Sequence, residues 1–408
     1  MRAYERFLEY VKIHTTSDEV SGTHPSSTIQ FSLAHRLVDE LCGMGIYAEC
    51  DDKCYVYATI PATEGFEDAP AIGFIAHMDT SPDFCGENVC PRVIENYNGE
   101  DVMLGEGRIL KKSDFPHLVG LKGRTLIVTD GKTLLGADDK AGIAEIMTLA
   151  ERLIEEKLPH GKICIAFTPD EEIGEGADHF DIEKFGADFA YTADGDVEGG
   201  IEYENFNAAG AAFEINGFNI HPGDAKNKMI NASLVAMEIN SLLPTDEIPA
   251  KTEGYEGFFH LTDMEGCVER STLKYIIRDH SAEIFAKRCQ TMHQIANQMN
   301  EKYGEGTVTL ILQEQYRNME EKIRPFFHVV ESAKLATREA GLEPTIKPIR
   351  GGTDGARLSY EGLPCPNLGT GGHAFHGPYE HITVEGMDKA VEILLGIVKI
   401  YRSFPMKK

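Results

Sequence analysis

The chain has 408 residues, of which 42% are hydrophobic and 26% charged, as in a globular protein of two or three domains. Its formal net charge of −27 excludes a phosphate-backbone partner, because nucleic-acid binders need a basic face. No apolar run is long enough to span a bilayer, and residues 1–8 predict an amphipathic helix rather than a signal peptide. The nine cysteines include no CxxC pair, so we expect reduced thiols in a cytoplasmic protein without nucleic-acid or membrane partners.

Strands and helices alternate through the first half of the chain. The pattern predicts a helix near 29–43, a hairpin over 47–50 and 54–60, and strands at 71–76, 126–128, 162–167 and 189–192. A helix from Asp138 to about residue 158 carries apolar residues at helical spacing, whereas segment 83–123 is periodic in nothing and we expect a functional loop there. We predict an α/β fold with a mixed, mostly parallel sheet flanked by helices. In such folds polar residues at strand C-termini face one crevice.

The pattern changes after about residue 205. Strands at 208–215, 257–262, 268–277 and 308–313, with helices at 229–243 and 281–303, give the order βαββαβ of a ferredoxin-like unit. We place the connection between its second and third strands at 263–266. A helix near 325–340, a strand at 345–349 and a last helix through Tyr401 resume the α/β pattern. We therefore predict a catalytic domain over 1–206 and 319–408, and an inserted ferredoxin-like lid domain of the dimerisation type over 207–318.

Acidic and histidine side chains follow several of the predicted strands. The candidates are His77, Asp138 with Asp139, Glu171 with Glu172, Asp194 and, in a late glycine-rich loop, His376. One aspartate at a helix start is most often a cap, one histidine is most often structural, and a glutamate pair is usually a solvated turn. Their joint occurrence favours a site instead. Two imidazoles with three or four carboxylates suit borderline divalent metals, zinc first, and one shared carboxylate would hold two ions about 3.5–4 Å apart.

Such a centre would lower the pKa of a bridging water to about 7 and polarise a scissile carbonyl. The glutamate of the pair that binds no metal could act as the general base. Asp79, two residues beyond His77 in an extended segment, could accept the other N–H of that imidazole.

Several longer runs resemble the peptidase T family, the tripeptide aminopeptidases of the zinc aminoacylase and carboxypeptidase G superfamily. They are IAHMDTSPD (75–83), LGADDKAG (135–142), PDEEIG (169–174), NIHPG (219–223), YIIRD (275–279) and PIRGGTDG (348–355). The HxD and DEE motifs alone are typical of the superfamily, whereas the longer runs indicate the peptidase T branch. The resemblance covers essentially the whole chain.

The resemblance implies a zinc-peptidase-like catalytic domain with two Zn²⁺ per subunit, for which Co²⁺ or Mn²⁺ are possible substitutes. Asp138 would bridge both ions. His77 and Asp194 would complete one metal site, and Glu172 and His376 the other. The peptide bond that follows Asp138 is typically cis in this family.

The same resemblance makes Glu171 the general base and Asp79 the partner of the metal-binding histidine. His221, at the edge of the lid, would help to stabilise the oxyanion. Arg278 in the lid and Arg350 in the catalytic core would hold the C-terminal carboxylate of short peptides, chiefly tripeptides. The simpler interpretation of each arginine is an ion pair. We expect a monomer or homodimer.

One loop departs from the family pattern. The family sequence is glycine-rich and closes on Gly-Glu, whereas Gly200 stands at that glutamate here, with Asp196 and Glu198 as added carboxylates. If this loop receives the ammonium group of the substrate, selectivity at the amino end is altered. We interpret His260, His373 and His381 as structural.

We predict a metal-dependent aminopeptidase that releases the N-terminal residue of tripeptides by attack of a bridging water. An aminoacylase or dipeptidase would share the metal site and differ in the lid, and the two arginines favour the peptidase. A non-catalytic peptide- or metal-binding relative should lack a ligand or the base, yet each position is filled. A dinucleotide-binding enzyme would need GxGxxG between an early strand and helix, and the glycine-rich loops do not supply it.

Overall fold

The computed structural model describes residues 1–403, which group into two compact units. The first unit comprises Met1–Tyr203, Glu321–Lys347 and the chain from Thr353 onward. The second comprises Glu204–Glu320 and Pro348–Gly352. The predicted insertion, 207–318, lies inside the second unit.

Residues 348–352, which we had assigned to the catalytic domain, group with the second unit instead. The reason is local pairing. Ile349 forms a parallel bridge with Asn205, and its N–H donates to the carbonyl of Glu204 at 2.8 Å. This short segment therefore belongs to the same unit as Glu204 and Asn205, the residues with which it pairs.

The first unit is built on an eight-stranded mixed sheet. In spatial order the strands are β1 (Tyr47–Cys50), β2 (Val56–Ile60), β8 (Ile163–Thr168), β3 (Ile72–His77), β9 (Phe189–Gly195), β16 (Asn367–Gly369), β10 (Gly200–Glu202) and β15 (Thr345–Ile346). Strands β8, β3, β9 and β16 are parallel neighbours, and β1 and β2 form an antiparallel edge. β3 and β8 are buried along their whole length, as parallel strands covered on both faces are. The predicted mixed, mostly parallel α/β sheet is confirmed.

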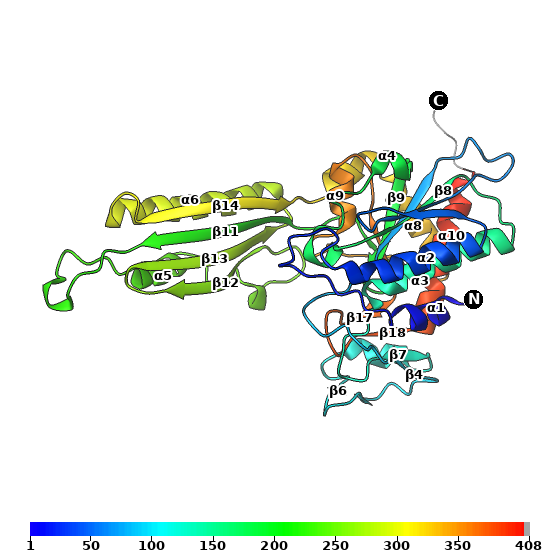
Figure 1. Ribbon diagram of the computed structural model, residues 1–408, viewed down its shortest axis with the longest axis horizontal. Coiled ribbons are helices and arrows are strands. Elements are labelled where there is room, and N and C mark those ends of the chain that lie inside the picture. Colours follow the sequence, from blue (N-terminus) through cyan, green and yellow to red (C-terminus); the bar gives the residue numbers. More distant parts are fainter. Residues whose placement is uncertain (404–408) are drawn as a thin grey trace. The chain divides into compact units, whose positions relative to one another are not determined.

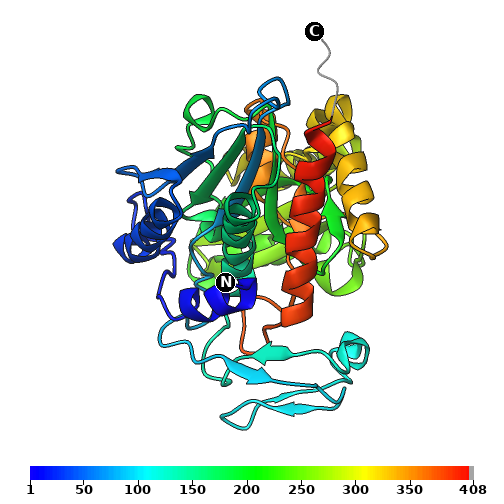
Figure 2. The ribbon, with the colours of Figure 1, turned by 90° about the vertical axis from the view of Figure 1, so that its right-hand side faces the viewer.

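Helices cover both faces of this sheet. On one face α3 (Ala137–Glu155) contacts β3, β9, α1 (Ala3–Tyr10) and α10 (Val384–Tyr401), and α10 contacts α8 (His328–Glu339). Figure 2 shows α3 and the red helix α10 side by side across the strands. On the other face, α4 (Ile182–Phe185) and α9 (Asp354–Tyr360) contribute Phe185 and Leu358 to a cluster with side chains of β3 and β8. The remaining helices are α2 (Phe31–Gly43), which contacts β1 and β2, and α7 (Glu320–Ile323).

A second, smaller sheet of short strands belongs to the same unit. Its order is β17 (Gly372–His373), β18 (His381–Thr383), β7 (Leu126–Val128) and β4 (Arg92–Ile94), and β5 (Val102–Met103) pairs with β6 (Ile109–Leu110) nearby in sequence. The expectation that 83–123 lacks regular structure is therefore wrong. Strands of two or three residues are too short to show alternation. β7 pairs antiparallel with β18 and β4, so it is not a parallel strand of the main sheet as we had predicted.

The second unit is a four-stranded antiparallel sheet with two helices (Figure 1). In chain order its elements are β11 (Asn207–Asn216), α5 (Ala232–Ser241), β12 (Phe258–Gly266), β13 (Arg270–Asp279), α6 (Ala282–Tyr303) and β14 (Val308–Tyr316). The strand order β12-β13-β11-β14 confirms the ferredoxin-like prediction. Alternate residues such as Phe213, Leu273 and Ile277 share one core with α5 and α6. Residues 263–266 continue β12 beyond a register shift, so the β12–β13 turn falls at 267–269 rather than where we had placed it.

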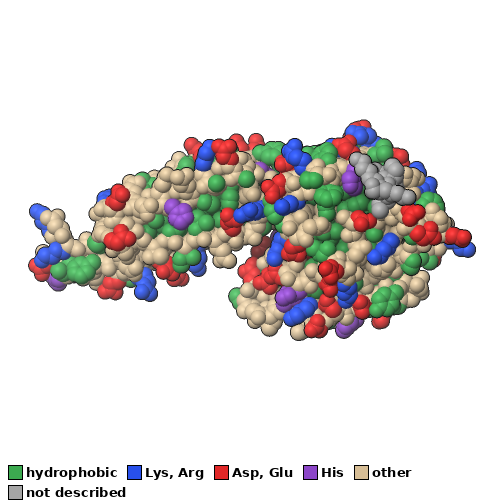
Figure 3. Space-filling model, turned by 90° about the horizontal axis from the view of Figure 1, so that it is seen from above, with side chains coloured by type: hydrophobic (Ala, Val, Ile, Leu, Met, Phe, Trp, Pro, Cys, Tyr) green, Lys and Arg blue, Asp and Glu red, His purple; other side chains and the backbone are tan. Residues whose placement is uncertain are grey.

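The surface is consistent with the strongly acidic composition. On the face shown in Figure 3, Lys and Arg side chains lie dispersed among Asp and Glu, and no continuous basic stripe crosses that face. Within residues 1–403, none of the helices combines the length and apolar character that crossing a membrane requires.

Glu145 is a buried acid in α3 whose two carboxylate oxygens have no hydrogen-bond partner among the described residues. Burial raises the pKa of this carboxyl well above its usual value of 4.5. The folded chain therefore binds this proton more tightly than the unfolded chain does. It follows that the free energy of unfolding falls as the pH rises from the unfolded pKa through the folded pKa.

We predict that Glu145→Gln raises the Tm at neutral pH, because the amide cannot ionise. The gain should be roughly 2–4 °C, which corresponds to about 1 kcal/mol, and should vanish as the pH falls to the pKa of the unfolded chain. Thermal melts followed by circular dichroism across pH measure the difference. Glu155→Gln, at an exposed position of the same helix, is the control. A Tm for Glu145→Gln at or below the native value at neutral pH would contradict the prediction.

Candidate active site

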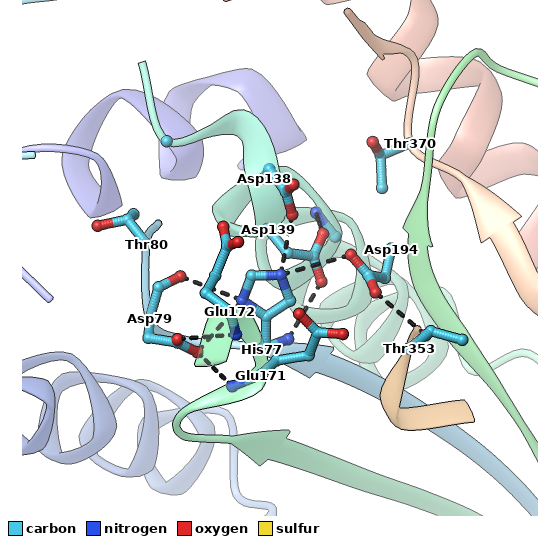
Figure 4. Close-up of polar contacts among 12 residues, drawn as sticks. His77, Asp79, Thr80, Asp138, Asp139, Glu171, Glu172, Asp194, Thr353 and Thr370 are labelled. Carbon is cyan, nitrogen blue, oxygen red and sulfur yellow. Dashed lines mark hydrogen bonds and ion pairs between the residues drawn. The ribbon is translucent and has the colours of Figure 1, made fainter. Parts of the chain in front are cut away.

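His77 ends β3 and is the residue around which the other polar side chains gather (Figure 4). Its Nε2 lies 2.8 Å from Oδ1 of Asp138 and 3.4 Å from Oδ1 of Asp194. Its Nδ1 lies 3.1 Å from the carbonyl oxygen of Asp79 and 3.4 Å from the carboxylate of the same residue. When the imidazole is neutral, a proton on Nδ1 leaves the lone pair on Nε2, the nitrogen that faces the two aspartates.

His376 completes a second group around the same aspartate. Its Nε2 lies 3.2 Å from Oδ2 of Asp138 and 3.0 Å from Oε2 of Glu172. The other oxygen of Glu172 is buried and has no hydrogen-bond partner among the described residues. Asp138 thus turns one carboxylate oxygen toward each of two imidazoles. The structure brings together all five residues that we predicted as metal ligands.

The N-terminus of α3 presents the aspartate pair, and the peptide bond between Asp138 and Asp139 is cis. One turn later, a Cβ on Gly142 would lie only 1.9 Å from the carbonyl oxygen of Ala193 in β9. Only glycine therefore lets α3 approach β9 so closely. Asp139 turns back toward the protein, where it accepts the N–H groups of His77 at 3.1 Å and Gly142 at 3.3 Å.

The carboxylate of Asp79 joins the end of β3 to the segment that follows β8. Its Oδ1 accepts the N–H of Glu171 at 3.0 Å, and its Oδ2 accepts the N–H of Glu172 at 3.1 Å. We had predicted only a contact with the imidazole of His77. Asp79 makes that contact chiefly through its carbonyl, while its side chain positions the glutamate pair.

Most of the clustered carboxyls have raised pKa values. Burial, with the nearby charge of Asp194, raises the pKa of Glu171 well above its usual range. Burial, with the charge of Asp138, raises the pKa of Glu172 to about 8, and burial raises that of Asp194 to about 6. For Asp138, burial acts upward, but hydrogen bonds from His376 and His77 hold its pKa below the usual range. Such a cluster is short of positive charge, and cations among these oxygens would favour their ionised forms.

The donor set fits two borderline divalent cations. Ligand atoms of His77, Asp138 and Glu172 lie within 4.8 Å of one another, and so do those of His77, Asp139 and Asp194. Asp139 is as close as the others, but both of its oxygens already accept backbone N–H groups. The partnerless oxygen of Glu172 supports the fit, because a buried carboxylate oxygen needs a hydrogen bond or a cation.

Glu380 supports the site, and we did not single it out from the sequence. Its Oε2 accepts the N–H groups of Leu135 at 2.6 Å and Gly136 at 2.9 Å, and its Oε1 accepts that of Asp138 at 3.1 Å. Burial raises its pKa to about 7. A single acid therefore fixes the turn that delivers the central aspartate. The only sequence signal was its position four residues after His376, which by itself indicates no role.

Two further buried carboxylates flank the site. Asp170, which immediately precedes Glu171, accepts hydrogen bonds from the backbone N–H of Ser26 at 2.7 Å and from Nε2 of Gln30 at 2.6 Å. Asp354 accepts the hydroxyl of Thr168 at 2.8 Å, at the end of β8. These contacts anchor the strand end that carries the glutamate pair.

Arg350 belongs to the second unit, so our assignment of it to the catalytic core is wrong. Its Nη1 donates to the carbonyls of Gly254 at 2.7 Å and Glu256 at 2.9 Å, and its Nη2 donates to the hydroxyl of Thr252 at 3.1 Å. The guanidinium also lies over the ring of Phe206. Most of its donors therefore hold a loop of its own unit.

Two other residues that we predicted to contact the substrate, Arg278 and His221, also lie in the second unit. Nη1 of Arg278 donates to the carbonyls of Ala209 at 3.2 Å and Ile277 at 3.0 Å. His221 is exposed, and its Nδ1 accepts the N–H of Gly223 at 3.1 Å. In the neutral imidazole the proton is then on Nε2, which is free to donate.

Known proteins resemble this chain along its whole length. The model of peptidase family M20/M25/M40 matches residues 128–400. Peptidase T of Clostridium perfringens (strain SM101) is 57% identical over 402 residues, which are 98% of this chain and 99% of that protein. The solved structure of a tripeptidase from Staphylococcus aureus aligns with a TM-score of 0.79 at 22% identity, over 99% of this chain and 98% of that one. A dinuclear metal-binding peptidase of the M20 family from Bacillus subtilis aligns with a TM-score of 0.66 at 15% identity, over 98% of both chains.

The two structural matches, at such low identity, show the fold, and the sequence matches show the family. The chain belongs to peptidase family M20/M25/M40. Within that family it groups with the peptidase T proteins, which confirms the resemblance noted in its sequence runs.

We predict that Glu380→Gln lowers peptidase activity about 10–100-fold, the usual effect of losing a partner that orients ligands. The amide presents one acceptor oxygen in place of two, so at least one of the three N–H groups loses its bond. Cleavage kinetics on a tripeptide measure the loss, and Glu392→Gln, at an exposed position of α10, is the control. Native kcat/KM in Glu380→Gln would show that the turn does not depend on this acid.

Proposed function

We propose that this chain is a dinuclear zinc aminopeptidase that removes the N-terminal residue from tripeptides. The observation that carries the proposal is the position of Asp138, with one carboxylate oxygen toward His77 and the other toward His376. The names of the relatives support it. They include a peptidase T, a tripeptidase and a dinuclear metal-binding peptidase.

We assign Asp138 to both ions, His77 and Asp194 to one ion, and Glu172 and His376 to the other. Two imidazoles with three carboxylates form a ligand set that suits Zn²⁺, and also Co²⁺ or Mn²⁺. When bound, the ions supply the Lewis acid that polarises the scissile carbonyl and the acidity that activates a water.

Glu171 is the proposed general base. Its backbone is fixed by Asp79, and no side chain among the described residues donates a hydrogen bond to its carboxylate. Figure 4 shows it beside His77, separate from Glu172. It can therefore take the proton of the attacking water and pass it to the leaving amine.

Groups for the two ends of the peptide are also available. Nε and Nη2 of Arg278 contact no acceptor among residues 1–403, whereas most donors of Arg350 are engaged, so we propose Arg278 as the receptor of the C-terminal carboxylate. His221, with Nε2 free to donate, remains our candidate for the oxyanion. The loop that differs from the family pattern contains two acids. Glu198 is paired with Arg124, which leaves Asp196 as the candidate to bind the ammonium group of the substrate.

The second candidate function is an aminoacylase or dipeptidase, which would use the same metal site. A non-catalytic relative is disfavoured because every ligand and the base are present.

All nine cysteines are free thiols, as we expected from the sequence. The cytoplasmic location stays a prediction, and so does the choice between monomer and homodimer.

We predict that chelation abolishes cleavage of a free tripeptide and that Zn²⁺ restores it. The dipeptide, the tetrapeptide and the N-acetylated tripeptide should be cleaved at least tenfold more slowly, because recognition needs both charged ends at one spacing. Chromatographic analysis of the products measures all four rates. Equal cleavage of the acetylated peptide would move the protein to the acylases. Failure to cleave any of them, with two metals bound, would favour a binding protein.

We predict that Glu171→Gln lowers kcat about 10²–10⁴-fold, the usual contribution of a general base, and leaves the metal content unchanged. Kinetics together with elemental analysis separate the two effects. Glu183→Gln, at an exposed position of α4, is the control and should behave like the native chain. Loss of metal from Glu171→Gln would make this residue a ligand rather than the base.

A further inference from the structure

Three histidines of the first unit form a cluster that takes no part in the proposed reaction. His373 in β17 and His381 in β18 stand directly opposite each other in the strand register. His117 comes from the 3-10 helix η2 (Pro116–Leu121), more than 250 residues earlier in the chain. From the sequence we had interpreted His373 and His381 as structural and had not considered His117.

The three rings lie close together in nearly parallel planes. Nε2 of His117 lies 2.8 Å from Nε2 of His381, and these two rings are parallel within 5°. The ring of His373 stacks on that of His117 with 4.1 Å between centroids. One ring nitrogen from each histidine lies within 4.8 Å of the others.

Each imidazole is neutral near pH 7. Burial lowers the pKa of His117, and burial together with the neighbouring imidazoles lowers that of His373 to about 3 and that of His381 to about 4. Nδ1 of His381 donates to the carbonyl of Tyr379 at 2.7 Å, so its Nε2 carries a lone pair directed at His117. Arg124, a cationic side chain whose charge acts on His373, is itself paired with Glu198.

We propose that His117, His373 and His381 form a third metal site, which takes a borderline divalent transition-metal ion such as Ni²⁺, Cu²⁺ or Zn²⁺. Three neutral imidazoles without a carboxylate select such ions over Mg²⁺ and Ca²⁺. The carbonyl of Tyr379 is the kind of outer partner that a metal-binding histidine commonly has. Binding replaces the proton between His117 and His381, which moves to Nδ1 of His117. Because the two Nε2 atoms face each other at 2.8 Å, the rings would turn so that each Nε2 directs its lone pair at an ion about 2.0–2.1 Å away.

The site would join parts of the first unit that are distant in sequence. An ion held there ties η2 to the β17–β18 hairpin, and His373 is only three residues before His376. The third ion would therefore hold the base of the loop that carries a proposed ligand of the dinuclear centre. The inference does not depend on the proposed reaction, because it rests on a different set of side chains.

The test compares the number of ions bound by the full-length chain and by two variants. Chelator-stripped protein is dialysed to equilibrium against Ni²⁺, and bound metal is counted by elemental analysis. His117→Phe keeps the stacked ring and removes the ligand, so we expect it to bind one ion fewer per chain than the native protein. His293→Phe, at an exposed position of α6, is the matched control and should bind as many ions as the native chain.

A second measurement distinguishes loss of the metal site from a folding defect in the variants. Cu²⁺ added to native protein at this site should give an electron paramagnetic resonance spectrum with splitting from imidazole nitrogens, which His117→Phe and His381→Phe should lose while their circular dichroism is unchanged. Because the expected difference is one ion per chain, it is independent of how many ions the dinuclear centre holds. An unchanged ion count in His117→Phe, together with an unchanged Cu²⁺ spectrum in His117→Phe and His381→Phe, would overturn the proposal.

Discussion

The candidate active site depends on the burial of several carboxylates around two imidazoles at the end of a parallel sheet. Two like charges 4 Å apart repel by about 4 kcal/mol at an effective dielectric constant of 20. Burial raises the pKa values of Glu172 and Asp194, and the nearby charge of Asp138 raises them further, so these carboxyls cannot all ionise there without added positive charge. Divalent cations would supply that charge, and the acidic side chains and His77 already point toward one another (Figure 4).

The convergence is maintained by acids that are not proposed ligands. Asp79, Asp139 and Glu380 each use both carboxylate oxygens to accept backbone N–H groups, and each fixes a segment that carries a ligand or the base. A carboxylate that accepts several backbone N–H groups holds its segment firmly, because charge-assisted hydrogen bonds are stronger than neutral ones. Gly142 adds a steric condition, since α3 reaches β9 only where a side chain is missing.

The sequence predicted those features that depend on local pattern or on strand ends. Buried runs predicted β3, β8 and β9, and the element order βαββαβ predicted the ferredoxin-like unit. The expected convergence of strand ends predicted His77, Asp194 and the glutamate pair. Glu380 could not be predicted, because its contacts cross more than 240 residues and no periodicity links it to the turn before Asp138. The same holds for His117 and His381. The predicted position of Arg350 was wrong because contacts between residues distant in sequence decide it: the bridge of Ile349 to Asn205 and the hydrogen bonds of Arg350 to Gly254 and Glu256.

That bridge has a consequence for how this chain can be recombined with its relatives. In the sequence the second unit looks like one continuous cassette, yet its cohesion includes Pro348–Gly352, which arrives from elsewhere in the chain. A chimera that exchanged only residues 204–320 would separate Glu204 and Asn205 from Ile349, and Arg350 from the loop that it holds through Gly254 and Glu256. An exchange that respects the fold must therefore carry two pieces of the gene from the same parent.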